Sequence, residues 1–104
     1  MVNRLIGDAR PTYLYGIGVS QSVAQSIVTG ALKDLGWPFR VRVETSERRT
    51  RRRHGTYFPR IRTILLYPIG MNVGTVIHEL SHVWGHGHGK VFKDAHRKLL
   101  RMWE

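Results

Sequence analysis

The segment Val76-Ile-His-Glu-Leu-Ser-His-Val-Trp-Gly-His-Gly-His88 is the most informative part of this chain. It contains two histidines four residues apart, His78 and His82, with Glu79 between them. On a helix, residues four apart lie on the same face, so both imidazoles can reach one metal ion. Glu79 then flanks the metal, and its carboxylate can hold and deprotonate a water molecule. The spacing therefore predicts a catalytic zinc site on a helix.

A catalytic zinc ion usually has three protein ligands, so a third ligand must follow this helix. His86 extends the same helical row, but residues eight apart lie ~12 Å apart along a helix axis. His78 and His86 therefore cannot reach one ion on a straight helix. Gly85 and Gly87 are suited to break the helix, after which His88 can fold back to the metal. His88 is the expected third ligand, His86 is the alternative, and Zn²⁺ is the expected cofactor.

Helical periodicity appears well before this segment. Apolar residues recur at spacings of three and four from Ala24 to Leu35, which places them on one helix face. Ser20 or Ser22 is suited to cap the start of this helix, and Gly36 is suited to end it.

Strand patterns occupy the middle of the chain. Residues 39–44 alternate apolar and charged side chains, which is the period of a half-buried strand. Residues 61–67 form a second run, rich in apolar side chains and ended by Pro68. We expect two or three strands here, with the arginine-rich stretch between the two runs at the tip of a hairpin.

Helical patterns return after Pro68. Asn72 is the expected N-cap of a helix that runs to about Trp84, and a last helix is expected over residues 90–103. Residues 1–18 carry little periodic signal and are expected to form an irregular N-terminal arm. These segments predict one α+β domain over residues 1–104, with an N-terminal helix, a small three-stranded sheet, the metal-binding helix and a C-terminal helix.

The composition is typical of a small basic protein. The 104 residues suffice for one domain, and a hydrophobic fraction of 41% is too high for a disordered chain. A formal charge of +10 favours binding to polyanions. The chain has no cysteine, which excludes disulfides and a thiolate zinc site. It also lacks a signal-peptide core and the ~20 apolar residues of a membrane span, so we expect a soluble, cytoplasmic protein with no membrane partner.

Much of the positive charge lies between residues 39 and 62, which hold nine arginines and two glutamates, a net charge of +7. This charge is either a solvated loop or a phosphate-binding patch, with Tyr57 and Phe58 nearby to stack on bases. Arginine also suits phosphate better than lysine, because its planar fork donates two hydrogen bonds at once. We expect contact with DNA or RNA through the densest part of the run, which consists of Arg48, Arg49, Arg51, Arg52 and Arg53.

The pattern His78-Glu-Leu-Ser-His82 followed by His88-Gly-Lys-Val-Phe92 resembles the SprT-like zinc peptidases. Those proteins carry an HExxH motif followed by an HGxxF-type segment, and the related WLM and YgjP-like metallopeptidases have a similar layout. The resemblance covers roughly residues 20–103, although the spacer between the second and third histidines is shorter than in many SprT-like members. It implies a minimal single-domain zincin fold, with the three histidines as ligands, Glu79 as the catalytic base and Phe92 packed beneath the site.

The resemblance also implies a function. The chain would be a zinc metallopeptidase that hydrolyses peptide bonds, with proteins bound to nucleic acid as its expected substrates. The strand over residues 61–67 would form the edge of the cleft and pair with an extended substrate backbone. Tyr67, His86 or an arginine would steady the oxyanion, with packing at the strand end as the alternative role of Tyr67. His54 and His96 are expected to be surface or packing residues.

Three other interpretations remain. The spacing also fits the metzincins, but these need a methionine turn, and Met102 falls within an expected helix. It also resembles the bacterial rRNA-maturation endoribonucleases, which place three histidines at these intervals. They lack the glutamate, so Glu79 favours hydrolysis of peptides over hydrolysis of RNA. A noncatalytic, zinc-bearing nucleic-acid-binding module is the third interpretation, and such a structural site would have no need of Glu79.

Overall fold

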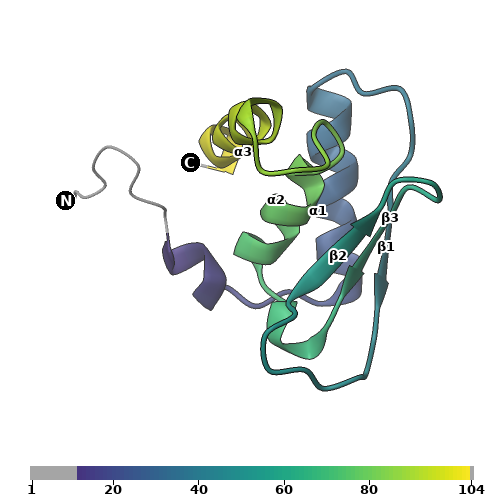
Figure 1. The fold of residues 1–104 in the computed structure, drawn as a ribbon, viewed down its shortest axis with the longest axis vertical. Coiled ribbons are helices and arrows are strands. Elements are labelled where there is room, and N and C mark those ends of the chain that lie inside the picture. The colour runs from purple at the N-terminus through teal and green to yellow at the C-terminus, as the bar shows by residue number, and fades with distance from the viewer. Residues whose placement is uncertain (1–11, 104) are drawn as a thin grey trace.

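The computed structural model describes residues 12–103, so the expectation for residues 1–11 lies outside the described part of the chain. In Figure 1, helices α1 and α2 cover one face of a small sheet, and α3 packs on α2. This arrangement confirms the expected α+β architecture. The elements in chain order are η2 (Thr12–Gly16), α1 (Gln21–Asp34), β1 (Arg42–Thr45), β2 (Gly55–Phe58), β3 (Thr63–Leu66), η3 (Pro68–Gly70), α2 (Val73–Ser81) and α3 (Lys90–Trp103).

Helix α1 begins and ends as its sequence predicts. Of the two candidate serines, Ser20 is the cap, because its Oγ accepts the backbone N–H of Val23 at 3.2 Å. At the other end Gly36 has a φ of +70°, a left-handed conformation that glycine adopts without steric cost. The backbone N–H of Gly36 donates to the carbonyl of Lys33, which closes the last turn.

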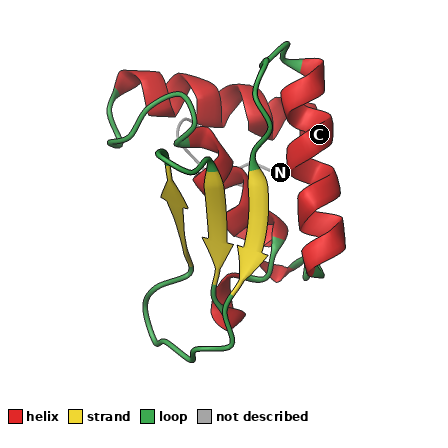
Figure 2. Cartoon of the chain, turned by 90° about the vertical axis from the view of Figure 1, so that its right-hand side faces the viewer, coloured by secondary structure: helices red, strands yellow, loops and turns green. Residues whose placement is uncertain are grey.

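The sheet has the strand order β1-β3-β2, with β1 parallel and β2 antiparallel to β3. Two predictions were wrong here. The arginine-rich segment 46–54 is not the tip of a hairpin, because it passes the end of β3 and joins the two outer strands (Figure 2). The tight hairpin is formed instead by residues 59–62, between β2 and β3. The strand within residues 61–67 is also not at an edge, because β3 is paired on both sides.

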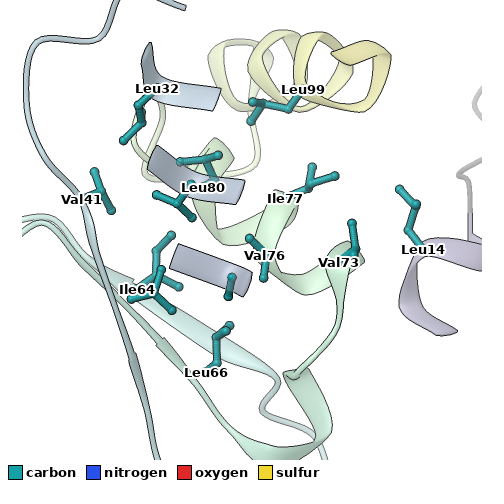
Figure 3. Close-up of a cluster of buried hydrophobic side chains, with 13 residues drawn as sticks. Leu14, Leu32, Val41, Ile64, Leu66, Val73, Val76, Ile77, Leu80 and Leu99 are labelled. Carbon is teal, nitrogen blue, oxygen red and sulfur yellow. The ribbon is translucent and has the colours of Figure 1, made fainter. Parts of the chain in front are cut away.

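Burial explains why β3 takes the centre of the sheet. Three of its four residues are buried, whereas each outer strand is at least partly exposed. Three consecutive apolar residues such as Ile64-Leu-Leu66 are typical of a strand covered on both faces. The core lies between this strand and the helices, and Figure 3 shows Ile64 and Leu66 beneath Val76 and Leu80 of α2.

Part of the segment expected to be irregular has regular structure. Residues 12–16 form the 3-10 helix η2, and Leu14 within it is only 1% exposed. In Figure 3 this side chain extends from η2 toward Val73 of α2. The expectation of an irregular segment was wrong for these residues, because one buried leucine among polar neighbours leaves no periodic signal.

No helix in residues 12–103 combines the length and the apolar character that crossing a membrane would require.

Candidate metal centre and its cleft

Helix α2 carries His78 and Glu79, and His82 follows directly at its C-terminal end. Asn72 caps it as predicted, because its Oδ1 accepts the backbone N–H of Thr75 at 2.8 Å. The α-helix ends at Ser81, three residues before the expected Trp84. The backbone N–H groups of residues 82–84 each donate to the carbonyl three residues earlier, so the last turn tightens to 3-10 geometry. His82 therefore lies at the C-cap, where the chain begins to turn.

The three predicted ligands converge. Each of His78, His82 and His88 offers one ring nitrogen, and these nitrogens all lie within 4.8 Å of one another. The Nε2 atoms of His78 and His88 are 3.3 Å apart. Two ligands of a tetrahedral zinc ion, each at 2.0–2.1 Å, are separated by about 3.3 Å. The cluster is therefore close enough to bind a metal ion, and its all-imidazole donor set suits zinc.

Two contacts orient these rings. The Nδ1 of His82 lies 2.9 Å from the carbonyl oxygen of Gly85, so a proton on Nδ1 leaves Nε2 free for a metal. The ring of Phe92 lies 4.5 to 5.0 Å from all three imidazole rings, measured between centroids. Phe92 is buried, and the predicted packing beneath the site is confirmed. Burial also lowers the pKa of His82, with positive charge on the neighbouring histidines adding to the effect, which favours the neutral ligand form.

Gly85 allows the chain to turn back. A Cβ atom at this position would lie 2.8 Å from the backbone nitrogen of Phe92, so the start of α3 can approach only a glycine. Gly87 meets nothing within 4 Å. The predicted break is confirmed, but its cause at Gly85 is close packing and not a left-handed backbone, since Gly36 is the one glycine with positive φ in residues 12–103.

Glu79 lies beside the three histidines and is buried, with 7% of its surface exposed. Burial raises the pKa of its carboxyl to about 7, because the charged form loses hydration. The outer strand β2 covers it closely: a Cβ atom at Gly55 would lie 3.2 Å from Glu79 Cγ and 2.9 Å from the carbonyl oxygen of Leu65. The backbone contact with Leu65 favours glycine at position 55, and the absence of a side chain there also leaves space beside Glu79.

Two cavities open on either side of Glu79. Both are lined by Gly55, His78 and Glu79, so together they form one cleft between α2 and β2. The first has a volume of about 350 Å³, and its remaining walls are Tyr15, Arg52, Arg53, His54 and Thr75. The second has a volume of about 480 Å³, and its remaining walls are Thr56, Tyr57, Pro59, His82, His86 and His88. Both volumes fall in the range of ligand sites.

Some of the other predicted site residues line the cleft and some do not. His86 is not in the histidine cluster, but it lines the second cavity. Tyr67 is buried in the core and lines neither cavity, which agrees with the packing role. Of the five clustered arginines, Arg52 and Arg53 line the first cavity. The other three are Arg48, Arg49 and Arg51, which lie on the same segment outside both cavities.

Several cleft residues had no signal in the sequence. Gly55 and Thr75 belong to different elements, and only the packing of β2 against α2 brings them to one cleft. Tyr15 lies against Gly74 of α2, with ring atoms 2.7 Å from where a Cβ atom would be.

His96 stacks on Phe92 with centroids 5.5 Å apart, which places it behind the metal site. Helical spacing could have found this last pair, since the two residues are four apart on α3.

Comparisons of the chain with protein-family models, with curated proteins and with solved structures gave no match, so its function is inferred from the geometry of the site.

Proposed function

We propose that this protein is a zinc metallopeptidase of the SprT-like kind. One observation carries the proposal: the buried carboxylate of Glu79 lies beside three convergent imidazoles and lines both halves of the cleft. A structural zinc site is usually closed by four protein ligands. Here three histidines leave a ligand position open, and a potential base lies next to it.

His78, His82 and His88 would hold the zinc ion. Zinc bound there supplies Lewis acidity, which polarises the scissile carbonyl and lowers the pKa of a water molecule. The protein contributes the remaining chemistry through the carboxylate and the cleft.

Glu79 acts as the general base and then as the general acid. Its carboxylate takes one proton from water while the water oxygen attacks the carbonyl carbon. It then gives that proton to the amide nitrogen, so the C–N bond breaks and a neutral amine leaves. Burial raises the pKa of Glu79 to about 7 in the metal-free protein. A nearby cation would lower this value and favour the ionised base.

The outer strand β2 is the proposed binding edge for substrate. Within the described residues β2 pairs with β3 alone, and Gly55, Thr56 and Tyr57 line the cleft. The free side of an edge strand can hydrogen-bond an extended peptide, which would then lie across Glu79. This assigns to β2 the role that the sequence suggested for residues 61–67.

Nucleic acid is a second proposed partner. Arg48, Arg49 and Arg51 are exposed on segment 46–54, outside the cleft, and suit contacts with phosphate. Contacts of this kind would hold the peptidase near proteins bound to DNA or RNA. They predict binding that weakens steeply with salt.

Incubation of the zinc-loaded protein with casein and with labelled RNA, with and without a chelator, tests the proposal. We expect casein to be cleaved, RNA to stay intact and the chelator to stop the reaction. The Glu79→Gln variant should be inactive, whereas Glu47→Gln, the same change on the exposed segment 46–54, should keep full activity. Cleavage of RNA but not of casein would identify a nuclease, and no cleavage of either would favour the noncatalytic module.

A further inference from the structure

The first cavity has an uneven distribution of charge. Its walls include the two arginines Arg52 and Arg53, and the single carboxylate among them is Glu79. In the described part of the chain neither arginine forms an ion pair with a carboxylate. Two positive charges at the cleft are therefore available to a ligand.

Hydrogen bonds and close packing fix the backbone that carries these arginines. Thr50 Oγ1 donates to the carbonyl of Arg53 at 2.6 Å, which closes a turn over residues 50–53. The next carbonyl, that of His54, accepts the N–H of Tyr67 at 3.0 Å. A Cβ atom at Gly70 would lie only 1.9 Å from the same His54 oxygen, so η3 packs directly on this backbone. The end of the arginine-rich segment is thus anchored beside the cleft.

A polar group lies in the wall of the same cavity. Thr75 is 2% exposed, and its Oγ1 has no hydrogen-bond partner among the described residues. Thr75 lies one helical turn before Glu79 on α2. Buried hydroxyls usually have partners, so this one marks a place where a polar ligand or a water molecule would be stabilised.

We propose that the first cavity is a subsite for an acidic side chain of the peptide substrate. The carboxylate of an Asp or Glu residue near the scissile bond would be bound by Arg52 and Arg53. This inference rests on the proposed peptidase function and adds a substrate class to it: acidic segments of proteins. Arginine suits this role because its guanidinium group binds a carboxylate through two parallel hydrogen bonds.

The cleft favours a peptide over a nucleic acid as the source of this charge. A nucleic acid carries a negative charge at every nucleotide, so a strand through the cleft would bring phosphates next to Glu79. A peptide can place one carboxylate beside the arginines and present a neutral backbone to Glu79. The cavity also continues to β2 at Gly55, where a free strand edge suits an extended peptide.

A binding experiment tests the subsite without requiring catalysis. The zinc-loaded Glu79→Gln protein is titrated into labelled ten-residue peptides that carry one Glu at successive positions of a neutral sequence. Matched peptides carry Gln or Lys at the same position, and anisotropy gives Kd. At one position or two neighbouring positions we expect Glu to bind about fivefold or more tighter than Gln, and Lys to bind most weakly.

Two pairs of substitutions, made in the Glu79→Gln protein, locate the effect. Arg52→Gln with Arg53→Gln should abolish the preference for Glu. The matched control, Arg48→Gln with Arg49→Gln, removes the same charge outside the cleft and should leave the preference for Glu unchanged. Arg52→Glu with Arg53→Glu should reverse the preference in favour of Lys. All four positions are exposed, so each variant should fold, and circular dichroism checks this.

Other outcomes would overturn the inference. Equal binding of the Glu and Gln peptides at every position would remove the subsite. Tighter binding of a single-stranded RNA oligonucleotide that displaces the Glu peptide and depends on Arg52 and Arg53 would make the cavity a phosphate site. The wild-type protein separates the two proposals. A preference for Glu peptides without cleavage would support the subsite and contradict the peptidase function. Cleavage without any preference would support the peptidase function and contradict the subsite.

Discussion

The histidine cluster and the arginine-rich segment are equally dense in sequence but differ in the structure. Four of the six histidines lie within eleven residues, and five arginines lie within six. Three of those histidines converge on one point, where Phe92 packs against their rings. The arginines are exposed and divide, with Arg52 and Arg53 at the cleft and the others outside it. The difference shows that density in sequence does not by itself bring side chains together, because here the three histidines share the packing partner Phe92 and, within residues 12–103, the arginines have no such partner.

The largest effect should come from the carboxylate next to the histidine cluster. Glu79→Gln removes the proposed base, so peptide cleavage should fall by about 10²–10⁴-fold. Zinc content should not change, because the side chain is not a ligand in the cluster. Peptide cleavage assays and mass spectrometry of the metal content measure the two quantities. A variant that keeps full activity would show that another group takes the proton.

The choice of third ligand gives the next effect. His88→Ala should weaken zinc affinity by on the order of 100-fold, because even residues that only support a ligand are worth 10–100-fold. His86→Ala is the matched control and should change zinc affinity little, since His86 lies outside the cluster. Competition with a zinc-binding dye measures both affinities. Equal losses in the two variants would contradict the geometry described here.

The turn between α2 and α3 can be tested through its glycines. Gly85→Ala forces a contact with the backbone of Phe92, and it should reduce the free energy of unfolding by about 1–3 kcal/mol. Gly87→Ala meets nothing within 4 Å and should have little effect. Chemical denaturation measures both variants. If the two glycines tolerated alanine equally well, close packing would not be the reason for Gly85.

The pH dependence of stability should report the burial of Glu79. Its pKa in the folded, metal-free protein is about 7, above the ordinary value of 4.5. The folded state therefore keeps a proton that the unfolded chain loses between these values. This stabilisation is fully present below pH 4.5 and is lost as the pH rises through 7. In chelator, the wild type should lose stability relative to Glu79→Gln over this range. Thermal melts at several pH values measure this difference. If the carboxylate were exposed, the Tm of the wild type and of Glu79→Gln would change with pH in parallel.

The smallest effect is expected from the arginines outside the cleft. Arg48→Gln with Arg49→Gln should weaken binding to DNA or RNA a few-fold and reduce its salt dependence. Peptide cleavage and thermal stability should not change, because these side chains are exposed and line neither cavity. Titrations at several salt concentrations measure the binding. No binding by the wild type at low salt would remove nucleic acid as a partner.

Helices and ligands were the predictable part of this protein. Ser20, Gly36 and Asn72 cap or end helices through contacts within a few residues of themselves. The HExxH spacing predicted that His78 and His82 converge, and the glycines after it favoured His88 over His86, which agrees with the observed cluster. Each of these inferences depends on chain geometry over at most about three helical turns, which residue spacing describes well.

Strand order and the walls of the cleft were not predictable in this way. The sequence suggested that residues 61–67 form the cleft edge, but β3 is central and β2 lies at the cleft. The apolar character of β3 is typical of a central strand. It therefore favoured a place in the middle of the sheet over the predicted hairpin with residues 39–44. Which arginines line the first cavity depends in turn on the path of segment 46–54 past the end of β3.

Local spacing thus predicted the three histidines that converge, the carboxylate beside them and the helix that carries His78 and Glu79. The fold as a whole determines that β2 borders the cleft, that Gly55 makes room for Glu79 and that Arg52 and Arg53 line the first cavity. The physical reason is the range of the interactions. Helix geometry relates residues a few positions apart, whereas strand pairing and loop placement depend on contacts between residues far apart in the chain.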